Sequence, residues 1–496
     1  MELNDTICAP ATIPGTGAIT VIRVSGPDTF TIADRIFQGK HQRVSEAGGY
    51  TILYGTIRDP WSEASLEAEV VDEVLLSVFR KPHSYTGEDS VEISCHASSY
   101  IASRIFSLLC KAGARMAEPG EFTRRAFING KMDLAQAEAV VDVISSSSAA
   151  AHRMAMAQLK GGYSQELSEI RAALVELTSL LELELDFSEE EVEFADRQKL
   201  LHLLETASAR IRSLAGSFRL GNTIKNGVPI AIVGEPNVGK STLLNALVGE
   251  DRALVSDQAG TTRDSIEECV VLDGIAFRFI DTAGLRESQE AVELMGMERT
   301  RQMISKAEIV LAVADASQSP AAIRQSVEAL AAQVDFQTQK MLVLLNKCDL
   351  NKNVKVINTI VSASVKDCIT LDISAREGAG LPQLRKTLVE LIKDRLPDSA
   401  EAVMVTNARH YESLRQTAAS LDAARSALEQ GIPSDLVAQD LRSALHSLGT
   451  ITGEVTTDEV LGMVFSRFCI GKQIESNNFH QICTKKYELS NNQLNT

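Results

Sequence analysis

Residues 230–247 read IAIVGEPNVGKSTLLNAL, the pattern of a buried strand followed by a glycine-rich loop and a helix. The apolar run 230–233 is typical of an interior strand, and residues 242–247 carry apolar side chains at helical spacing. Between them stands G-x-x-x-x-G-K-S, the spacing of a phosphate-binding loop. A chance glycine-rich turn would not need such a strand before it and such a helix after it. The chain is therefore predicted to bind a nucleoside triphosphate.

Each position of this loop has a chemical reason. Gly234 and Gly239 allow backbone N–H groups to curl around phosphates, and the helix that follows adds its positive N-terminal dipole. Lys240 can reach the β- and γ-phosphates, and the Ser241 hydroxyl can coordinate Mg²⁺. Thr242 completes the predicted phosphate-binding set.

Further motifs follow in the order and spacing of a Ras-like GTP-binding domain. They are GTTRD at 260–264, DTAG at 281–284, NKCD at 346–349 and Ser-Ala at 374–375. A single DxxG or NKxD motif would be weak evidence, whereas all of these elements in order, set among strand patterns, indicate a GTPase domain. The residues that they add to the predicted nucleotide site are Thr261, Thr262, Asp281, Gly284, Asn346, Lys347, Asp349, Ser374 and Ala375.

The motifs divide the chemistry among them. A threonine of the GTTRD motif can close over Mg²⁺ and the γ-phosphate, so the predicted Mg²⁺ ligands are Ser241, Thr262 and Asp281. The Gly284 N–H can sense the γ-phosphate. Asp349 carries the choice of base, because its carboxylate can accept from the ring N–H and the exocyclic amine of guanine, whereas adenine would leave it unpaired.

Leu285 stands where Ras-like switches carry a glutamine that orients the attacking water. Leucine has no polar atom to offer, so the catalytic group must come from elsewhere. Arg286, Glu287, Glu293 and Arg252 are polar candidates. Salt bridges on a helix surface are the alternative for all four, and spacing alone does not choose between them.

The net charge, the apolar content and the cysteine pattern of the chain exclude some classes of function. The chain has 496 residues and a formal net charge of −17, which argues against a protein that coats nucleic acid by bulk electrostatics. A local basic patch stays open near Arg124, Arg125 and Lys131, or at Lys485-Lys486. No run of ~20 apolar residues and no signal peptide are evident, so the expected location is the cytoplasm, without membrane contact. The eight cysteines form no C-x-x-C pair, which favours reduced thiols over a zinc site or disulfide framework.

The predicted fold class is α/β plus α, with four parts. Residues 1–122 form an N-terminal α/β domain, and residues 225–396 a Ras-like P-loop domain with a largely parallel sheet covered on both faces. Residues 123–224 and 397–472 have helical composition, so the nucleotide domain is predicted to be inserted into one helical domain. Residues 473–496 are interpreted as a polar, disordered tail.

Within the N-terminal domain, β-branched runs at 18–26, 70–79 and 90–96 predict strands. The helical spacing of residues 101–111 predicts a helix. These patterns alone indicate no more than a small α/β domain.

Further motifs lie mostly outside the GTP site. They are NDTI at 4–7, IRVSG at 22–26, YTGED at 85–89, PGEFT at 119–123, RAF at 125–127, DLAQAEA at 133–139, DTAGLR at 281–286 and FSRFCIGK at 465–472. On these motifs the chain resembles the MnmE (TrmE) family of tRNA-modification GTPases over nearly its whole length, and FSRFCIGK is highly specific.

The resemblance implies a homodimer formed through the N-terminal domain, with a tetrahydrofolate donor such as 5-formyltetrahydrofolate bound near the dimer interface. Arg23, Glu92 and Lys131 fall on the family's folate-contacting positions, and Lys472 is counted with them. An acid can hydrogen-bond a pterin, and cations can hold a glutamyl tail. Without the resemblance, Arg23 and Glu92 would be interpreted as ordinary strand-surface charges.

A flavin-dependent partner of the MnmG type is also implied. With it, the family installs an aminomethyl or carboxymethylaminomethyl group on C5 of the wobble uridine of certain tRNAs. The partner would supply the flavin and much of the basic surface for tRNA, which is compatible with the charge of −17.

For hydrolysis, the resemblance implies a K⁺ ion that compensates for Leu285. Asn237 and the loop carbonyls from Ser256 to Gln258 would bind the ion, Glu293 would help to orient the water, and two nucleotide domains would meet face to face. The predicted catalytic residues are Glu293, Asn237, Lys240, Arg286 and Cys469.

Two departures from the family pattern stand out. The family's CHGG run is CHAS here at 95–98, beside the predicted folate site, and residues 473–496 extend beyond the usual CIGK ending. Cys469 is either a functional thiol that meets the folate site or a buried core residue, and both interpretations stay open.

Two other functions compete with tRNA modification. One is a ribosome-assembly or signalling GTPase switch, which a KH fold with a basic Gly-x-x-Gly loop would favour, and the sequence offers no such loop. The other is a folate-dependent one-carbon enzyme that GTP merely regulates.

Overall fold

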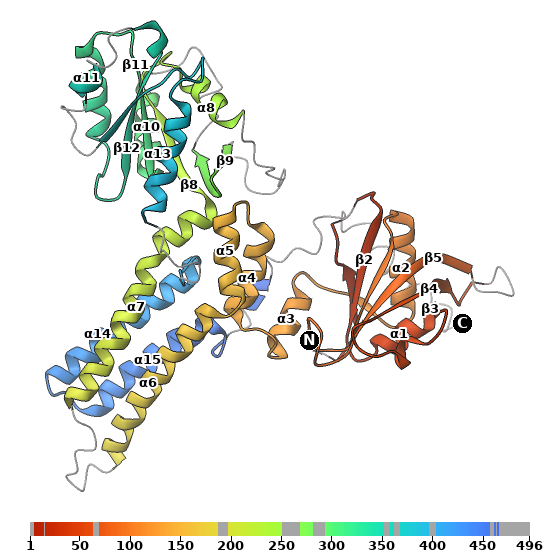
Figure 1. The fold of residues 1–496 in the computed structure, drawn as a ribbon. Helices are drawn as coiled ribbons and strands as arrows, with labels where there is room; N and C mark the ends of the chain where they lie inside the picture. Colours follow the sequence, from red (N-terminus) through yellow and green to blue (C-terminus); the bar gives the residue numbers. More distant parts are fainter. Residues whose placement is uncertain are drawn as a thin grey trace. The chain divides into compact units, whose positions relative to one another are not determined.

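The computed structural model divides into two compact units, residues 1–141 with 452–496 and residues 142–451 (Figure 1). The residues that the structure describes are 4–13, 15–62, 69–186, 197–249, 268–280, 293–351, 357–361, 368–395, 403–456, 461–462 and 464–465.

The first unit is built on a seven-stranded sheet in the order β3-β4-β5-β6-β2-β1-β7. Only the β1–β7 pair is parallel among the described strand pairs of this sheet. The predicted strands at 18–26, 70–79 and 90–96 are confirmed as β2, β5 and β6. The strand bounds are β1 Ile7–Pro10, β2 Ile19–Ser25, β3 Phe37–Gly39, β4 Thr51–Asp59, β5 Glu69–Phe79, β6 Ser90–His96 and β7 Arg115–Met116.

Helices α1 (Thr29–Ile36) and α2 (Ser99–Lys111) contribute to the core on one face of this sheet, together with inward residues such as Ile22 and Ile93. The predicted helix at 101–111 is therefore confirmed. Strand pairing puts Arg23 opposite Glu92, Glu92 opposite Ser77 and Ser77 opposite Ile52. Because strand side chains alternate between faces, these residues share the outer face of the sheet. A short 3₁₀ helix η1 (Val44–Glu46) and helices α3 (Glu121–Ile128) and α4 (Leu134–Ser145) complete the elements up to residue 145.

The second unit contains a six-stranded sheet in the order β13-β12-β11-β8-β10-β9. All pairs are parallel except β9–β10, as the alternation of strand and helix patterns predicted. The strand bounds are β8 Val228–Val233, β9 Glu268–Leu272, β10 Ile275–Phe279, β11 Ile309–Asp315, β12 Lys340–Asn346 and β13 Cys368–Asp372.

Helices cover both faces of this sheet. Ile230 and Ile232 of β8 join α8 (Lys240–Val248) and α13 (Leu381–Lys393) in one core, whereas Ala231 and Val233 join α10 (Glu293–Lys306) and α11 (Pro320–Ala331) in another. A strand buried on both faces reads as a continuous apolar run, which explains the IAIV sequence that precedes the loop.

Helical segments from both sides of the nucleotide domain in sequence pack together. Phe218 of α7 stacks on Tyr411 of α14 with 4.6 Å between ring centroids, and the N–H of Val405 donates to Ser217 Oγ at 3.0 Å. The helical segments that precede and follow the nucleotide domain in sequence therefore pack in one layer. The domain boundaries predicted at 122, 224 and 396 remain predictions. The helices are α5 Ala149–Leu159, α6 Gly162–Asp186, α7 Arg197–Asn226, α14 Ala408–Glu429 and α15 Ser434–Thr452.

Candidate functional site

The phosphate loop joins β8 to α8, as the sequence predicted. Gly239 caps α8 with φ 97°, and a Cβ atom there would overlap the amide nitrogen of Asn346. Gly234 has φ 148°, and a Cβ atom there would overlap the carbonyl oxygen of Val313. Both positions therefore demand glycine, because the loop turns tightly against the ends of β11 and β12.

Lys240 folds back over this loop. Its Nζ donates to the carbonyl oxygens of Gly234 at 2.8 Å and Glu235 at 2.7 Å. Burial lowers the pKa of the Lys240 ammonium from its ordinary value. Ser241 and Thr242 follow in the first turn of α8 with exposed side chains. An ammonium, a helix N-terminus and hydroxyl groups form a donor set that fits a magnesium-bound triphosphate.

Asn346 holds the loop against the base-reading segment. Its amide nitrogen donates to the carbonyl of Val238 at 2.8 Å, and its amide oxygen accepts from the N–H of Ala375 at 2.9 Å. Asn346 is 2% exposed, so both bonds are shielded from water. Ser374, also buried, accepts from the N–H of Glu377 at 3.3 Å. The structure thus brings together three motifs that are far apart in sequence.

Lys347 makes a second link to the loop. Its Nζ donates to the carbonyl of Asn237 at 2.9 Å, and its backbone is left-handed with φ 64°. Asn237 is also left-handed, with φ 62°, and its side chain is exposed. Asp349 lies exposed in the 3₁₀ helix η3 (Cys348–Leu350), where its carboxylate is accessible to a base.

Asp315 is a site residue that the motifs do not reveal. It ends β11, and its carboxylate accepts from Lys347 Nζ at 2.5 Å. Burial alone would raise the pKa of this carboxyl, but hydrogen bonds from Lys347 and Ser317 outweigh that effect and hold the pKa below its ordinary value. A sequence signal does exist, because ligands of parallel α/β sheets bind beyond the carboxyl ends of the strands.

Several predicted site residues lie outside the described part of the chain. Glu293 opens α10, but its side chain is outside the described residues, as is all of Leu285. The other such residues are Arg252, Ser256, Gln258, Thr261, Thr262, Asp281, Gly284, Arg286, Glu287, Cys469 and Lys472. Their roles remain predictions.

Arg23 and Glu92, predicted to contact folate, form an ion pair across β2 and β6. Arg23 Nε lies 2.9 Å and Nη2 2.7 Å from Glu92 Oε1, and the guanidinium stands over the rings of Tyr85 and Phe122 at 5.0 and 5.7 Å. Lys131 is exposed and donates to the carbonyl of Pro82 at 3.1 Å. An acid and a guanidinium are therefore paired beside two aromatic rings on the outer face of the sheet.

Arg125 is not part of a basic surface patch, which corrects one expectation from the sequence. Its side chain has no exposed area and binds the carboxylates of Asp5 at 2.6 Å, Glu121 at 3.0 Å and Glu88 at 3.2 Å. It also donates to the Asp5 carbonyl at 2.7 Å. A buried guanidinium surrounded by acids is neutralised and cannot attract phosphates, so Arg125 instead links Asp5, Glu88 and Glu121 inside the first unit.

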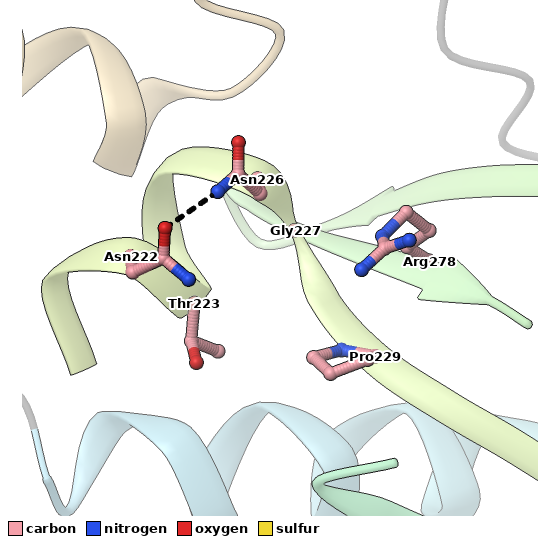
Figure 2. Close-up of a pocket in the computed structure, with 6 residues that line it drawn as sticks. All are labelled: Asn222, Thr223, Asn226, Gly227, Pro229 and Arg278. Atoms are coloured by element: carbon pink, nitrogen blue, oxygen red, sulfur yellow. Dashed lines mark hydrogen bonds between the residues drawn. The ribbon is translucent and has the colours of Figure 1, made fainter. Parts of the chain in front are cut away.

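A polar cleft of about 350 Å³ lies where α7 meets β8 and β10 (Figure 2). Figure 2 shows Asn226 donating to Asn222, a bond of 2.8 Å, with Arg278 on the other side of Gly227. The cleft contains none of the motif residues, so we assign it no part in nucleotide binding. Its lining residues are Asn222, Thr223, Asn226, Gly227, Pro229 and Arg278.

Within the described ranges, no helix has the length and apolar character needed to cross a bilayer. Nor do the residues described there gather three or more His, Cys, Asp or Glu side chains in a way that could hold a metal ion.

Comparisons with known proteins cover almost the whole chain. Residues 6–131 match the family model described as GTP-binding protein TrmE N-terminus, and residues 134–469 match the MnmE helical domain model. A protein of Bacteroides thetaiotaomicron named tRNA modification GTPase MnmE is 48% identical over 95% of this chain and 100% of its own length. A protein of the same name from Porphyromonas gingivalis is 47% identical over 95% of this chain and 98% of its own length.

Similarity to solved structures is much weaker. A GTP-binding protein of Sulfolobus solfataricus in complex with GDP is 16% identical, covering 49% of this chain and 73% of its own, with a TM-score of 0.27.

Proposed function

Because the chain belongs to the MnmE family of tRNA modification GTPases, we propose that it hydrolyses GTP in support of the modification of tRNA. The observation that carries the proposal is the contact of Asn346 with both the phosphate loop and Ala375. These bonds hold the phosphate-binding and base-reading motifs together, as binding of a guanine nucleotide across both motifs requires.

The nucleotide site requires Mg²⁺ in this proposal. Ser241, Thr262 and Asp281 would hold the ion, which neutralises charge on the phosphates when it is bound. Lys240 adds a fixed cation over the loop, and the backbone N–H groups at the start of α8 supply further donors. Positioning and charge neutralisation are the main demands of phosphoryl transfer, so these groups suit a hydrolase.

We propose that K⁺ supplies the charge that Leu285 cannot, with Asn237 and the carbonyls of Ser256 to Gln258 as its ligands. The exposed, left-handed Asn237 supports a ligand role, because its side chain is available at the edge of the phosphate loop. Replacing K⁺ by Na⁺ at constant ionic strength should lower the GTPase rate by at least about tenfold, since a smaller ion needs a tighter ligand cage. Equal steady-state rates in the two salts would rule out this role of Asn237.

Glu293 is proposed to orient the attacking water, with Arg286 as the nearby alternative. Glu293→Ala should keep GTP affinity within about twofold and lower kcat by about 10²-fold, the usual range for loss of one general-base interaction. Equilibrium titration with GTP measures the affinity, and steady-state hydrolysis at saturating GTP measures kcat. Unchanged turnover would shift the role to Arg286.

The first unit is proposed to bind a reduced folate such as 5-formyltetrahydrofolate at Arg23, Glu92, Lys131 and Lys472. The outer face that carries Arg23 and Glu92 also exposes Ile52, Tyr54 and Leu75, at 67%, 42% and 47%. An exposed apolar patch beside these charges supports a folate site near a homodimer interface.

Glu92→Gln should weaken the binding of 5-formyltetrahydrofolate by about tenfold, because a charge-assisted hydrogen bond to the pterin is lost. Glu46→Gln is the matched control, since Glu46 is an exposed carboxylate of the same unit that lies in η1 and not on the outer face of the sheet. Isothermal titration of the full chain measures both variants. Equal affinities for the two would remove Glu92 from the site.

The tRNA chemistry is proposed to require a flavin-dependent MnmG-type partner, which together with this chain modifies C5 of the wobble uridine. The net charge of −17 and the burial of Arg125 among acids support a partner that supplies basic surface for the tRNA. Nucleoside analysis of tRNA from cells that lack this protein is the direct test, and an aminomethyl or carboxymethylaminomethyl group should be missing. If the level of the modified wobble uridine were unchanged in such cells, the result would favour a GTPase switch that has no modification chemistry.

The four-part division is proposed to reflect these roles, with the nucleotide domain at 225–396 inserted between 123–224 and 397–472. Residues 1–122 would bind folate and dimerise. A separately expressed 225–396 segment should bind GDP with an affinity close to that of the full chain, and failure of a folded segment to do so would refute this division.

A further inference from the structure

The last residue of β11 lies beside the end of β12. Strand register puts Asp315 opposite Asn346, and the chain continues from Asn346 into Lys347. Asp315 is 8% exposed. Its Oδ2 accepts from Lys347 Nζ at 2.5 Å, and its Oδ1 accepts from the N–H and the Oγ of Ser317 at 2.9 and 2.6 Å. The two oxygens of this largely buried carboxylate therefore have different partners. Oδ1 binds the turn at Ser317, and Oδ2 binds the ammonium of Lys347.

The same ammonium reaches the phosphate loop. Lys347 Nζ donates to the carbonyl of Asn237 at 2.9 Å, so it bridges Asp315 and the loop. A lysine ammonium on a flexible stem has many rotamers, and a buried partner removes most of that freedom. Because a trans peptide is planar, a carbonyl of Asn237 fixed on one side aims the N–H of Val238 to the other side.

We propose that Asp315 is a positioning residue for the guanine nucleotide, which acts by fixing Lys347 between the base-reading Asp349 and the phosphate loop. It touches no nucleotide atom itself. The inference deepens the proposed GTPase function and rests on it. The competing explanation is local, namely that Asp315 merely caps the turn at residues 315–318 through Ser317.

The variant Asp315→Asn separates the two explanations. An asparagine oxygen can still accept from Ser317, so the turn keeps its cap, but the negative charge that holds Lys347 is gone. The dissociation constant for a fluorescent GDP analogue and the KM for GTP should both rise about tenfold, the value of one charge-assisted hydrogen bond. The kcat at saturating GTP should stay within about twofold, because the reacting groups are untouched.

Two further single variants test whether the effect is specific to the charge at Asp315. Asp335→Asn is the matched control, because Asp335 caps a similar turn of the same domain through Gln337 and Thr338 on an exposed surface, and its affinity should be unchanged. Asp315→Glu retains the charge and should recover at least a third of the wild-type affinity. If Asp315→Asn lowers the thermal midpoint so far that binding cannot be measured, the Asp315→Glu variant against wild type carries the comparison.

A double-mutant cycle decides whether Asp315 acts through Lys347. In a Lys347→Met background, Asp315→Asn should change the GDP dissociation constant by less than about twofold, because the residue it positions is already absent. Multiplicative losses, or a wild-type affinity for Asp315→Asn alone, would overturn the proposal. GDP affinity is measured independently of turnover, so a chain that binds GDP but hydrolyses no GTP would refute the proposed function and still report on Asp315.

Discussion

Asp349→Asn should weaken GTP binding by on the order of 10³-fold or more and shift the preference to xanthosine triphosphate. Guanine offers two donors, its ring N–H and its exocyclic amine, and both suit a carboxylate. An asparagine amide presents one donor and one acceptor, which instead suits xanthine, whose exocyclic amine is replaced by a carbonyl. The exposed position of Asp349 in η3 leaves its carboxylate accessible to such a base.

Competition between GTP and xanthosine triphosphate for a fluorescent GDP analogue measures this exchange. Asp335→Asn makes the same chemical change elsewhere in the domain and should leave guanine preference intact. If Asp349→Asn retained guanine preference, the base-reading residue would have to be sought outside NKCD.

Gly239→Ala should weaken nucleotide binding by about 10²-fold or more. A left-handed φ of 97° is strained for alanine by about 1–3 kcal/mol, and the new Cβ atom would overlap the buried amide of Asn346. Asn346 cannot move aside without losing its bonds to Val238 and Ala375. The phosphate loop and the base-reading segment would therefore lose their common support.

Gly216→Ala is the contrasting variant. Gly216 lies within α7, and a Cβ atom there would meet no atom within 4 Å. Alanine favours a helix over glycine by about 1 kcal/mol, so this variant should raise the thermal midpoint and leave GDP binding unchanged. GDP titration and thermal unfolding of both variants measure these effects, and normal GDP affinity in Gly239→Ala would contradict the packing described for the loop.

The phosphate loop and its domain could be predicted from sequence because their signals are local. Residues 230–247 encode three consecutive features: a strand buried on both faces, a loop with two required glycines and an apolar helix. Each feature has its own sequence pattern. The motif at 346–349 was likewise recognisable, since its residue types at fixed spacing suit guanine. The structure shows in addition that Asn346 and Lys347 contact the loop through hydrogen bonds to the carbonyls of Val238 and Asn237.

The partners of Arg125 and Asp315 could not be predicted from local sequence patterns. In sequence, Arg125 is one of several basic residues near 124–131, and nothing nearby indicates that Asp5 and Glu88 will surround it. Asp315 and Lys347 lie 32 residues apart, and Lys347 and Asn237 lie 110 apart. Strand order brings these three residues together.

Sequence alone predicted a guanine nucleotide as the ligand, a parallel sheet in its domain and the family of the chain. It could do so because backbone conformation and motif chemistry depend on near neighbours. Tertiary structure decided which charged residues are buried, which are paired and which remain available to a ligand. The physical reason is that a charge takes its role from its surroundings: Arg125 is neutralised among acids, whereas Asp349 stays exposed. Those surroundings form only when distant segments pack.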